Sequence, residues 1–90
     1  MILYHWEFAK KADKDFSKMD KQIQIRIIKW LDEHIENSNN PRAWGKALEG
    51  NFGTLWRYRV GKYRIIANIN DDKFTVIIVK TSIRNDIYKN

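Results

Sequence analysis

Four cations stand close together in the segment LWRYRVGKYRII, residues 55–66, and no acid accompanies them. These cations are Arg57, Arg59, Lys62 and Arg64. A guanidinium group stays charged at any physiological pH and offers planar, two-point donors to the oxygens of a phosphate. The residue types and their spacing therefore indicate a site that binds phosphate groups, although single arginines on a protein surface are more often simply solvated.

The excess positive charge of the chain is concentrated in its middle. The net charge is +6, from 17 lysines and arginines against 11 acids. Residues 1–40 balance seven cations with seven anions, whereas residues 41–64 carry six cations, Lys46 among them, against Glu49 alone. A basic patch confined to one segment is typical of a polyanion partner. The alternative is that the cations only form a lysine-rich surface that keeps the protein in solution. That interpretation fits the charge-balanced residues 1–40 better than residues 41–64.

Composition excludes several other classes of site. The chain has no cysteine, which rules out disulfides and a cysteine zinc site. His5 and His34 lie far apart and the acids form no ligand cluster, so we expect no metal and no other cofactor. Both histidines are expected to be structural. We also expect Trp44 and Trp56 to anchor the core or a loop rather than to stack on bases.

Length and hydropathy indicate one small domain covering residues 1–90. No apolar run approaches the roughly 18–20 residues that a membrane-spanning helix needs. The first residues, MILYHWEFAKK, lack the basic start and long apolar stretch of a signal peptide. We therefore expect a cytoplasmic protein without a membrane partner.

Hydrophobic periodicity predicts the elements that come before the basic segment. Residues 2–6 are typical of a short strand. From Glu7 the apolar spacing becomes helical, and Asp20 is expected to cap a second helix that ends in the turn-forming sequence ENSNNP. Residues 42–54 show little periodicity and are expected to form an extended loop. The two helices would form a hairpin with one apolar face.

Three strands are then predicted, at residues 55–60, 63–69 and 73–80. A two-residue II′ turn at Gly61 would pair Arg59 directly with Arg64, and directly paired residues share a face of a sheet. The alternation places one set on a core face, namely Trp56, Tyr58, Val60, Tyr63, Ile65, Ala67, Ile69, Phe74, Val76 and Ile78. The opposite, open face receives Arg57, Arg59, Arg64, Thr75, Ile77 and Val79. The predicted fold is α+β, a mostly antiparallel sheet backed by an N-terminal helical hairpin, in the order β-α-α-β-β-β with a short C-terminal element.

The stretch GKALEGNFGTLWRYRVGKYRIIANI, followed by VIIVK, an arginine and a late IY, resembles the RelE/ParE superfamily of bacterial toxins in type II toxin–antitoxin systems, particularly its RelE branch. The resemblance covers essentially the whole chain, and residues 45–66 are its most specific part. It implies the same α+β fold and a metal-independent, ribosome-dependent cleavage of mRNA in the A site. It also implies neutralisation by a cognate antitoxin, with operator DNA bound only through the antitoxin complex.

The same resemblance implies roles for individual residues. The expected catalytic residues are Arg64, Arg84 and Tyr88, and the expected RNA- or ribosome-binding residues are Arg57, Arg59, Lys46 and Lys62. Preplaced arginines would stabilise the charge that develops on the phosphate during cleavage. Tyr88 would stack on an unpaired base or take part in proton transfer, and a plug that closes the core is the structural alternative.

One position departs from the pattern of many relatives. Ile83 stands where they carry the histidine of a G-H-R motif, so the obvious acid–base group is missing. RelE itself works without that histidine. Two alternatives stay open: a ParE-like toxin that inhibits DNA gyrase without cleaving nucleic acid, and a catalytically weakened homologue that binds an antitoxin or an operator. Retention of Arg64, Arg84 and Tyr88 together favours the nuclease.

Overall fold

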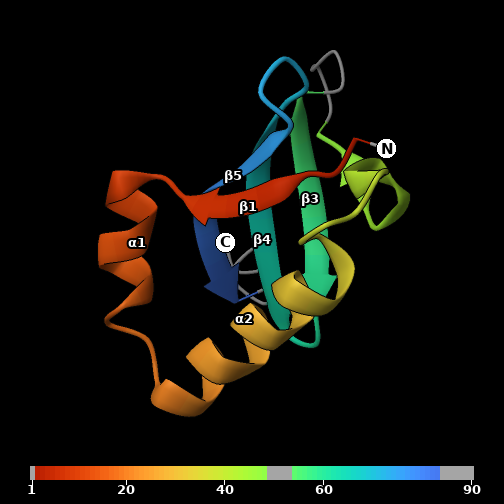
Figure 1. Ribbon diagram of the computed structural model, residues 1–90. Helices are drawn as coiled ribbons and strands as arrows, with labels where there is room; N and C mark the ends of the chain where they lie inside the picture. Colours follow the sequence, from red (N-terminus) through yellow and green to blue (C-terminus); the bar gives the residue numbers. More distant parts are fainter. Residues whose placement is uncertain (1, 49–53, 84–90) are drawn as a thin grey trace.

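The computed structural model describes residues 2–48 and 54–83 of the chain (Figure 1). Its elements are β1 (His5–Phe8), α1 (Lys10–Phe16), α2 (Lys21–His34), the 3-10 helix η1 (Pro41–Ala43), β2 (Lys46–Ala47), β3 (Leu55–Val60), β4 (Tyr63–Asn70) and β5 (Thr75–Ile83). The predicted α+β order is confirmed, with β2 as an additional strand. The expected C-terminal element lies outside the described residues.

The strands form one mixed sheet in the order β1-β5-β4-β3-β2. Only the pairing of β1 with β5 is parallel among the described strands, and the other pairs are antiparallel. The predicted register of β3 and β4 is confirmed, because Val60 pairs with Tyr63 and Arg59 pairs with Arg64. Gly61 has φ 60°, the left-handed backbone that the first position of a II′ turn requires.

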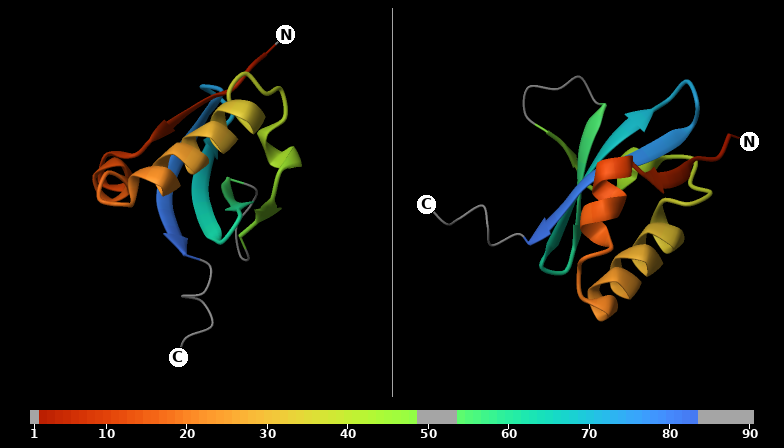
Figure 2. Two further views of the ribbon diagram at one scale, coloured as in Figure 1. Left: turned by 90° about the horizontal axis from the view of Figure 1, so that it is seen from below. Right: turned by 90° about the vertical axis from the view of Figure 1, so that its left-hand side faces the viewer.

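Both helices lie on one side of the sheet, as Figure 2 shows. α1 packs against β1 and β5, and α2 packs against β3. The side chain of Asp20 accepts a hydrogen bond from the backbone N–H of Gln22 at 3.2 Å, which confirms the predicted helix cap. No described helix is long and apolar enough to cross a membrane. Among the described residues, no helix covers the opposite face of the sheet, which we call the open face.

The predicted core face is largely confirmed. The residues that form the buried core are Tyr4, Phe16, Ile27, Leu31, Ile35, Tyr58, Val60, Ile65, Ala67, Ile69, Val76 and Ile78. Ile27, Leu31 and Ile35 follow each other at helical spacing and are fully buried. Burial of these aliphatic side chains supplies most of the free energy that holds α2 on the sheet.

Phe74 is where the prediction of the core face is wrong. Four residues separate Asn70 from its partner Thr75, so the turn between β4 and β5 is longer than expected. The Asn70 side chain accepts hydrogen bonds from the backbone N–H groups of Asp72 and Lys73, at 3.1 and 3.2 Å, and this shapes the turn. Phe74 ends the turn with φ 48° and is 37% exposed, because it lies outside the alternating backbone of β5.

The ends of the N-terminal elements and the expected loop also differ from the prediction. β1 begins at His5 rather than at residue 2, and α1 begins at Lys10. Part of the expected loop is ordered as η1 and β2, and η1 is fixed to the sheet by the hydroxyl of Tyr58, which donates to the carbonyl oxygen of Pro41 at 2.7 Å. Burial raises the pKa of Tyr58, so this hydroxyl keeps its proton.

Candidate nucleic-acid interface

The open side of the sheet gathers the cations of the central segment. In the register of strands β2 to β5, one row across the sheet contains Lys46, Arg57, Ile66 and Lys80. The neighbouring row contains Arg59, Arg64 and Ser82. We call the five cations of these two rows, Lys46, Arg57, Arg59, Arg64 and Lys80, the basic face. They come from four strands, so the intact sheet is needed to bring them together.

In the two rows of the basic face, none of the described residues that pair is an aspartate or glutamate. Glu7 is on the same side of the sheet, but it pairs with Ile77 on the outermost strand β1, beyond both rows. Arg59 and Arg64 pair directly, and directly opposed like charges on a sheet repel each other. An anion bound between the two guanidinium groups would relieve this repulsion.

A β-bulge brings Lys80 to the basic face. Ala67 pairs with Ile78 but Ile66 pairs with Lys80, so Val79 is an extra residue in β5. Without the bulge, strict alternation from Ile78 would turn Lys80 toward the helices, where burying its ammonium group would be costly. Sequence reasoning missed Lys80 because it assumed an unbroken strand. The sequence does contain a signal for the bulge, because strict alternation would place the charged side chain of Lys80 in the core.

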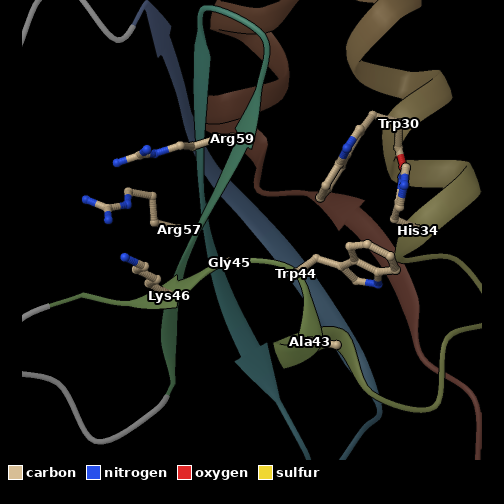
Figure 3. Close-up of a pocket in the computed structure, with 8 residues that line it drawn as sticks. All are labelled: Trp30, His34, Ala43, Trp44, Gly45, Lys46, Arg57 and Arg59. Atoms are coloured by element: carbon tan, nitrogen blue, oxygen red, sulfur yellow. The ribbon is translucent and has the colours of Figure 1, made fainter.

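The conformation of Gly45 brings Lys46 opposite Arg57. Gly45 has φ 142°, and a Cβ atom at this position would overlap the backbone carbonyl oxygen of Arg57. Only glycine therefore lets the chain approach β3 closely enough to form β2. The sequence pattern predicts a loop at Lys46, but this residue belongs to the edge strand of the sheet. Figure 3 shows its side chain beside those of Arg57 and Arg59.

The remaining predicted site residues lie elsewhere. Lys62 is exposed in the turn between β3 and β4, at the end of the basic face rather than within its rows. Arg84 and Tyr88 lie outside the described residues. Of the predicted catalytic residues, Arg64 is therefore the one whose place the structure describes: it is half-buried in β4, opposite Arg59.

The two histidines have structural partners. His5 Nδ1 lies 2.9 Å from a carboxylate oxygen of Glu36. Burial raises the pKa of Glu36, but hydrogen bonds from His5 and from the backbone N–H of Trp6 outweigh it and leave the pKa lowered. His34 Nδ1 lies 2.9 Å from the carbonyl oxygen of Trp30 and donates to it, since a carbonyl only accepts. Neither ring reaches the rows of the basic face.

Known toxins resemble this chain in sequence over nearly its whole length. A family model described as the ParE toxin of the type II toxin–antitoxin system parDE matches residues 6–88. Toxin RelG of Mycobacterium tuberculosis is 28% identical over 86 residues, which are 96% of this chain and 97% of RelG.

Two solved structures extend the comparison. A chain of the RelB–RelE antitoxin–toxin complex from Methanococcus jannaschii is 34% identical, with a TM-score of 0.66, and the match covers 90% of this chain and 93% of that one. A chain of the toxin–antitoxin complex RelBE2 from Mycobacterium tuberculosis has a TM-score of 0.77 at 24% identity, covering 92% of this chain and 100% of that one. The chain therefore belongs to the RelE/ParE superfamily of type II toxin–antitoxin toxins.

Proposed function

We propose that this toxin is a ribosome-dependent mRNA endonuclease of the RelE kind, which inhibits translation by cleaving mRNA in the A site. The single observation that carries this proposal is the basic face, in which Arg59 opposes Arg64 beside the row formed by Lys46, Arg57 and Lys80. Such a concentration of cations suits the backbone of a single-stranded message, whose phosphates attract cations and release counterions on binding.

The proposed reaction needs no metal. The 2′-hydroxyl of a ribose would attack the adjacent phosphorus, forming a 2′,3′-cyclic phosphate and releasing the 5′-oxygen of the next nucleotide, which takes up a proton. Arg64 would stabilise the negative charge that develops on the phosphate oxygens, with Arg84 as its proposed partner. Arginine effectively never deprotonates, so neither residue is the base. Tyr88 is the proposed group for base stacking or proton transfer, and the ribosome would hold the message in line for attack.

We also propose that a cognate antitoxin neutralises the toxin. The similar chains from Methanococcus jannaschii and Mycobacterium tuberculosis were solved as toxin–antitoxin complexes. An acidic antitoxin segment would complement the basic face and fold as it binds. Co-expression with the product of the neighbouring small open reading frame should restore growth and give a complex that co-purifies. Separate elution of the two proteins at low salt would contradict this pairing.

The mechanism is tested by primer extension on an mRNA translated in an extract that contains the purified toxin. We expect new 5′ ends that appear only while ribosomes translate, and no cleavage of the same naked RNA. A gyrase supercoiling assay with the same protein serves as the control for the other branch of the family. Cleavage that proceeds equally without ribosomes would contradict the proposed dependence.

A ParE-like toxin that inhibits DNA gyrase is the second candidate, because the family model that matches this chain is described as a ParE toxin. In that case supercoiling would be lost while translation continues and the message stays intact. Failure of both assays, with antitoxin binding retained, would identify a catalytically weakened homologue. Ile83, in place of the histidine that many relatives have, is the residue that supports this third outcome.

A further inference from the structure

A third row of side chains lies on the open face, next to the basic face. It contains Leu55, Asn68, Ile77 and Glu7, which pair across β3, β4, β5 and β1. Asn68 follows Ile66 by two residues in β4, so it lies on the same side of the sheet as the basic face, about 7 Å farther along the strand. None of the described residues that pair in this row is a cation. The charge of the open face therefore changes within one step along the strands.

A hollow of about 330 Å³ opens at this row, at the end of the sheet where β3 and β5 begin and β4 ends (Figure 1). Asn68, Asn70 and Ile77 line it from the sheet, and Asp72 lines it from the turn between β4 and β5. Ile77 gives the hollow an apolar part. Its volume is at the lower end of the roughly 300–1,000 Å³ of small-molecule sites, which suits one planar base rather than a large ligand.

The polar side chains of the hollow differ in how far they are already used. The Asp71 carboxylate is held by hydrogen bonds from a guanidinium group and a tyrosine hydroxyl. The amide oxygen of Asn70 accepts from two backbone N–H groups of the turn, at 3.1 and 3.2 Å, which leaves its NH₂ group to donate. Within the described part of the chain, no residue holds the Asn68 amide or the Asp72 carboxylate in a hydrogen bond or ion pair. The hollow therefore offers amide donors beside one carboxylate acceptor.

We propose that this hollow binds one unpaired guanine of RNA, whose phosphate lies on the neighbouring row at Arg57 and Lys80. The Asp72 carboxylate accepts hydrogen bonds from the adjacent N1–H and 2-amino groups of the base, and the amide groups of Asn68 and Asn70 donate to its O6. Base and phosphate thus bind to the same face of the sheet. The choice of RNA as the ligand rests on the proposed function.

The other bases complement the hollow less well. Adenine and cytosine each present one amino group next to a bare ring nitrogen, whose lone pair a carboxylate repels. Uracil presents a single N–H group between two carbonyl oxygens. The carboxylates of Asp71 and Asp72 also disfavour a phosphate in the hollow, so the RNA backbone stays on the cationic rows while the base enters. Guanine is therefore the base that matches the donors and acceptors of the site.

Three trinucleotides of 2′-O-methyl RNA test the inference on the full chain without ribosomes. The probes UGU, UIU and UUU carry the same charge, differ only in the middle base and resist cleavage because their 2′-oxygens are blocked. The base of I is hypoxanthine, which lacks the 2-amino group of guanine. Fluorescence anisotropy of the labelled probes should show that UGU binds about tenfold more tightly than UUU, as one bidentate base contact gives. UIU should lose most of that preference.

Variants separate the hollow from the basic face. Asp72→Asn should remove most of the preference for UGU over UUU, because the amide replaces one acceptor oxygen by a donor. Asn68→Ala should lower the preference about fivefold, as expected for loss of one hydrogen bond. Glu7→Gln is the matched control: it removes one negative charge from the same row without lining the hollow, so it should change the affinity for all three probes by the same factor. Circular dichroism verifies that each variant is folded.

Two results would overturn the inference: equal affinity for UGU and UUU, or a preference for guanine that survives both Asp72→Asn and Asn68→Ala. Loss of antitoxin binding in these variants, with no guanine preference in the parent, would assign the hollow to the antitoxin instead. The assay contains neither ribosome nor cleavable RNA. Guanine preference with no mRNA cleavage would therefore refute the proposed function alone, and cleavage without guanine preference would refute the hollow alone.

Discussion

At the scale of the residue, the pairing of Arg59 with Arg64 sets two like charges directly opposite each other on the basic face. Opposed like charges destabilise a sheet, and nearby Lys46, Arg57 and Lys80 add to the repulsion. A phosphate bound between the two arginines would relieve this repulsion, and the relief would add to the free energy of binding. The half-buried position of Arg64 also limits the motion of its side chain, as preorganised charge stabilisation requires.

We predict that Arg64→Ala lowers the rate of ribosome-dependent mRNA cleavage about a hundredfold or more, the usual effect of removing one preplaced charge donor. Arg84→Ala should have a similar effect if the proposed role of Arg84 is right. Primer extension gives the rates, and circular dichroism verifies that each variant is folded. Lys10→Ala, on the charge-balanced first helix, is the control and should cleave normally. Full activity of both arginine variants would exclude the proposed mechanism.

At the scale of the element, β2 depends on a single glycine. Gly45→Ala would place a methyl group on the carbonyl oxygen of Arg57 and force a non-glycine residue to φ 142°. We expect a loss of about 1–3 kcal/mol in the free energy of unfolding, measured by urea denaturation. Ala47→Ser, an exposed change in the same strand, should alter it by less than about 0.5 kcal/mol. Equal stability of Gly45→Ala and the parent would mean that β2 does not depend on this close approach.

The connection between η1 and the sheet gives a second prediction for an element. Tyr58→Phe removes the hydrogen bond to the Pro41 carbonyl and leaves that acceptor buried, which should cost about 1–3 kcal/mol of unfolding free energy. The packing of the ring in the core is kept, so the loss reports on the hydroxyl. Tyr63→Phe, at a partly exposed position, is the matched control. If both variants unfold at the same urea concentration, the hydrogen bond contributes little.

At the scale of the whole molecule, Asp71 joins three segments that are far apart in the sequence. Its carboxylate accepts two hydrogen bonds from the Arg42 guanidinium, both at 2.9 Å, and one from the Tyr4 hydroxyl at 2.6 Å. The N-terminal segment, η1 and the turn between β4 and β5 thus meet at one side chain. Arg42, and after it Tyr4, lowers the pKa of Asp71 in the folded protein.

The lowered pKa predicts how stability depends on pH. Asp71 stabilises the fold at pH values above its unfolded pKa, near 3.9, and this contribution is lost as the pH falls through the lower folded pKa. Asp71→Asn should therefore cost up to about 1 kcal/mol at neutral pH, a value limited by solvent screening of an exposed pair, and nothing in strong acid. Urea unfolding at both pH values measures the difference. Asp72→Asn is the control, and a cost of Asp71→Asn that persists in acid would contradict the assignment.

Much of the basic face could be predicted because it depends on local rules. Gly61 marks a two-residue turn, and the turn sets the register that pairs Arg59 with Arg64. Alternation with period two then separates the buried Tyr58 and Ile65 from the arginines. These rules failed where the chain departs from regular geometry, at Phe74 in the turn and at the bulge that moves Lys80.

The sequence by itself determined the order of the elements, the two faces of the β3–β4 hairpin and the family, because each follows from residues that are near neighbours along the chain. Only the tertiary structure decided the rest. The bulge in β5 aligns Lys80 with Lys46 across four strands, and the packing of α2 places the His34 ring against Trp44. Such contacts depend on how distant segments fill space against one another, and the spacing of residues along the chain does not specify that packing.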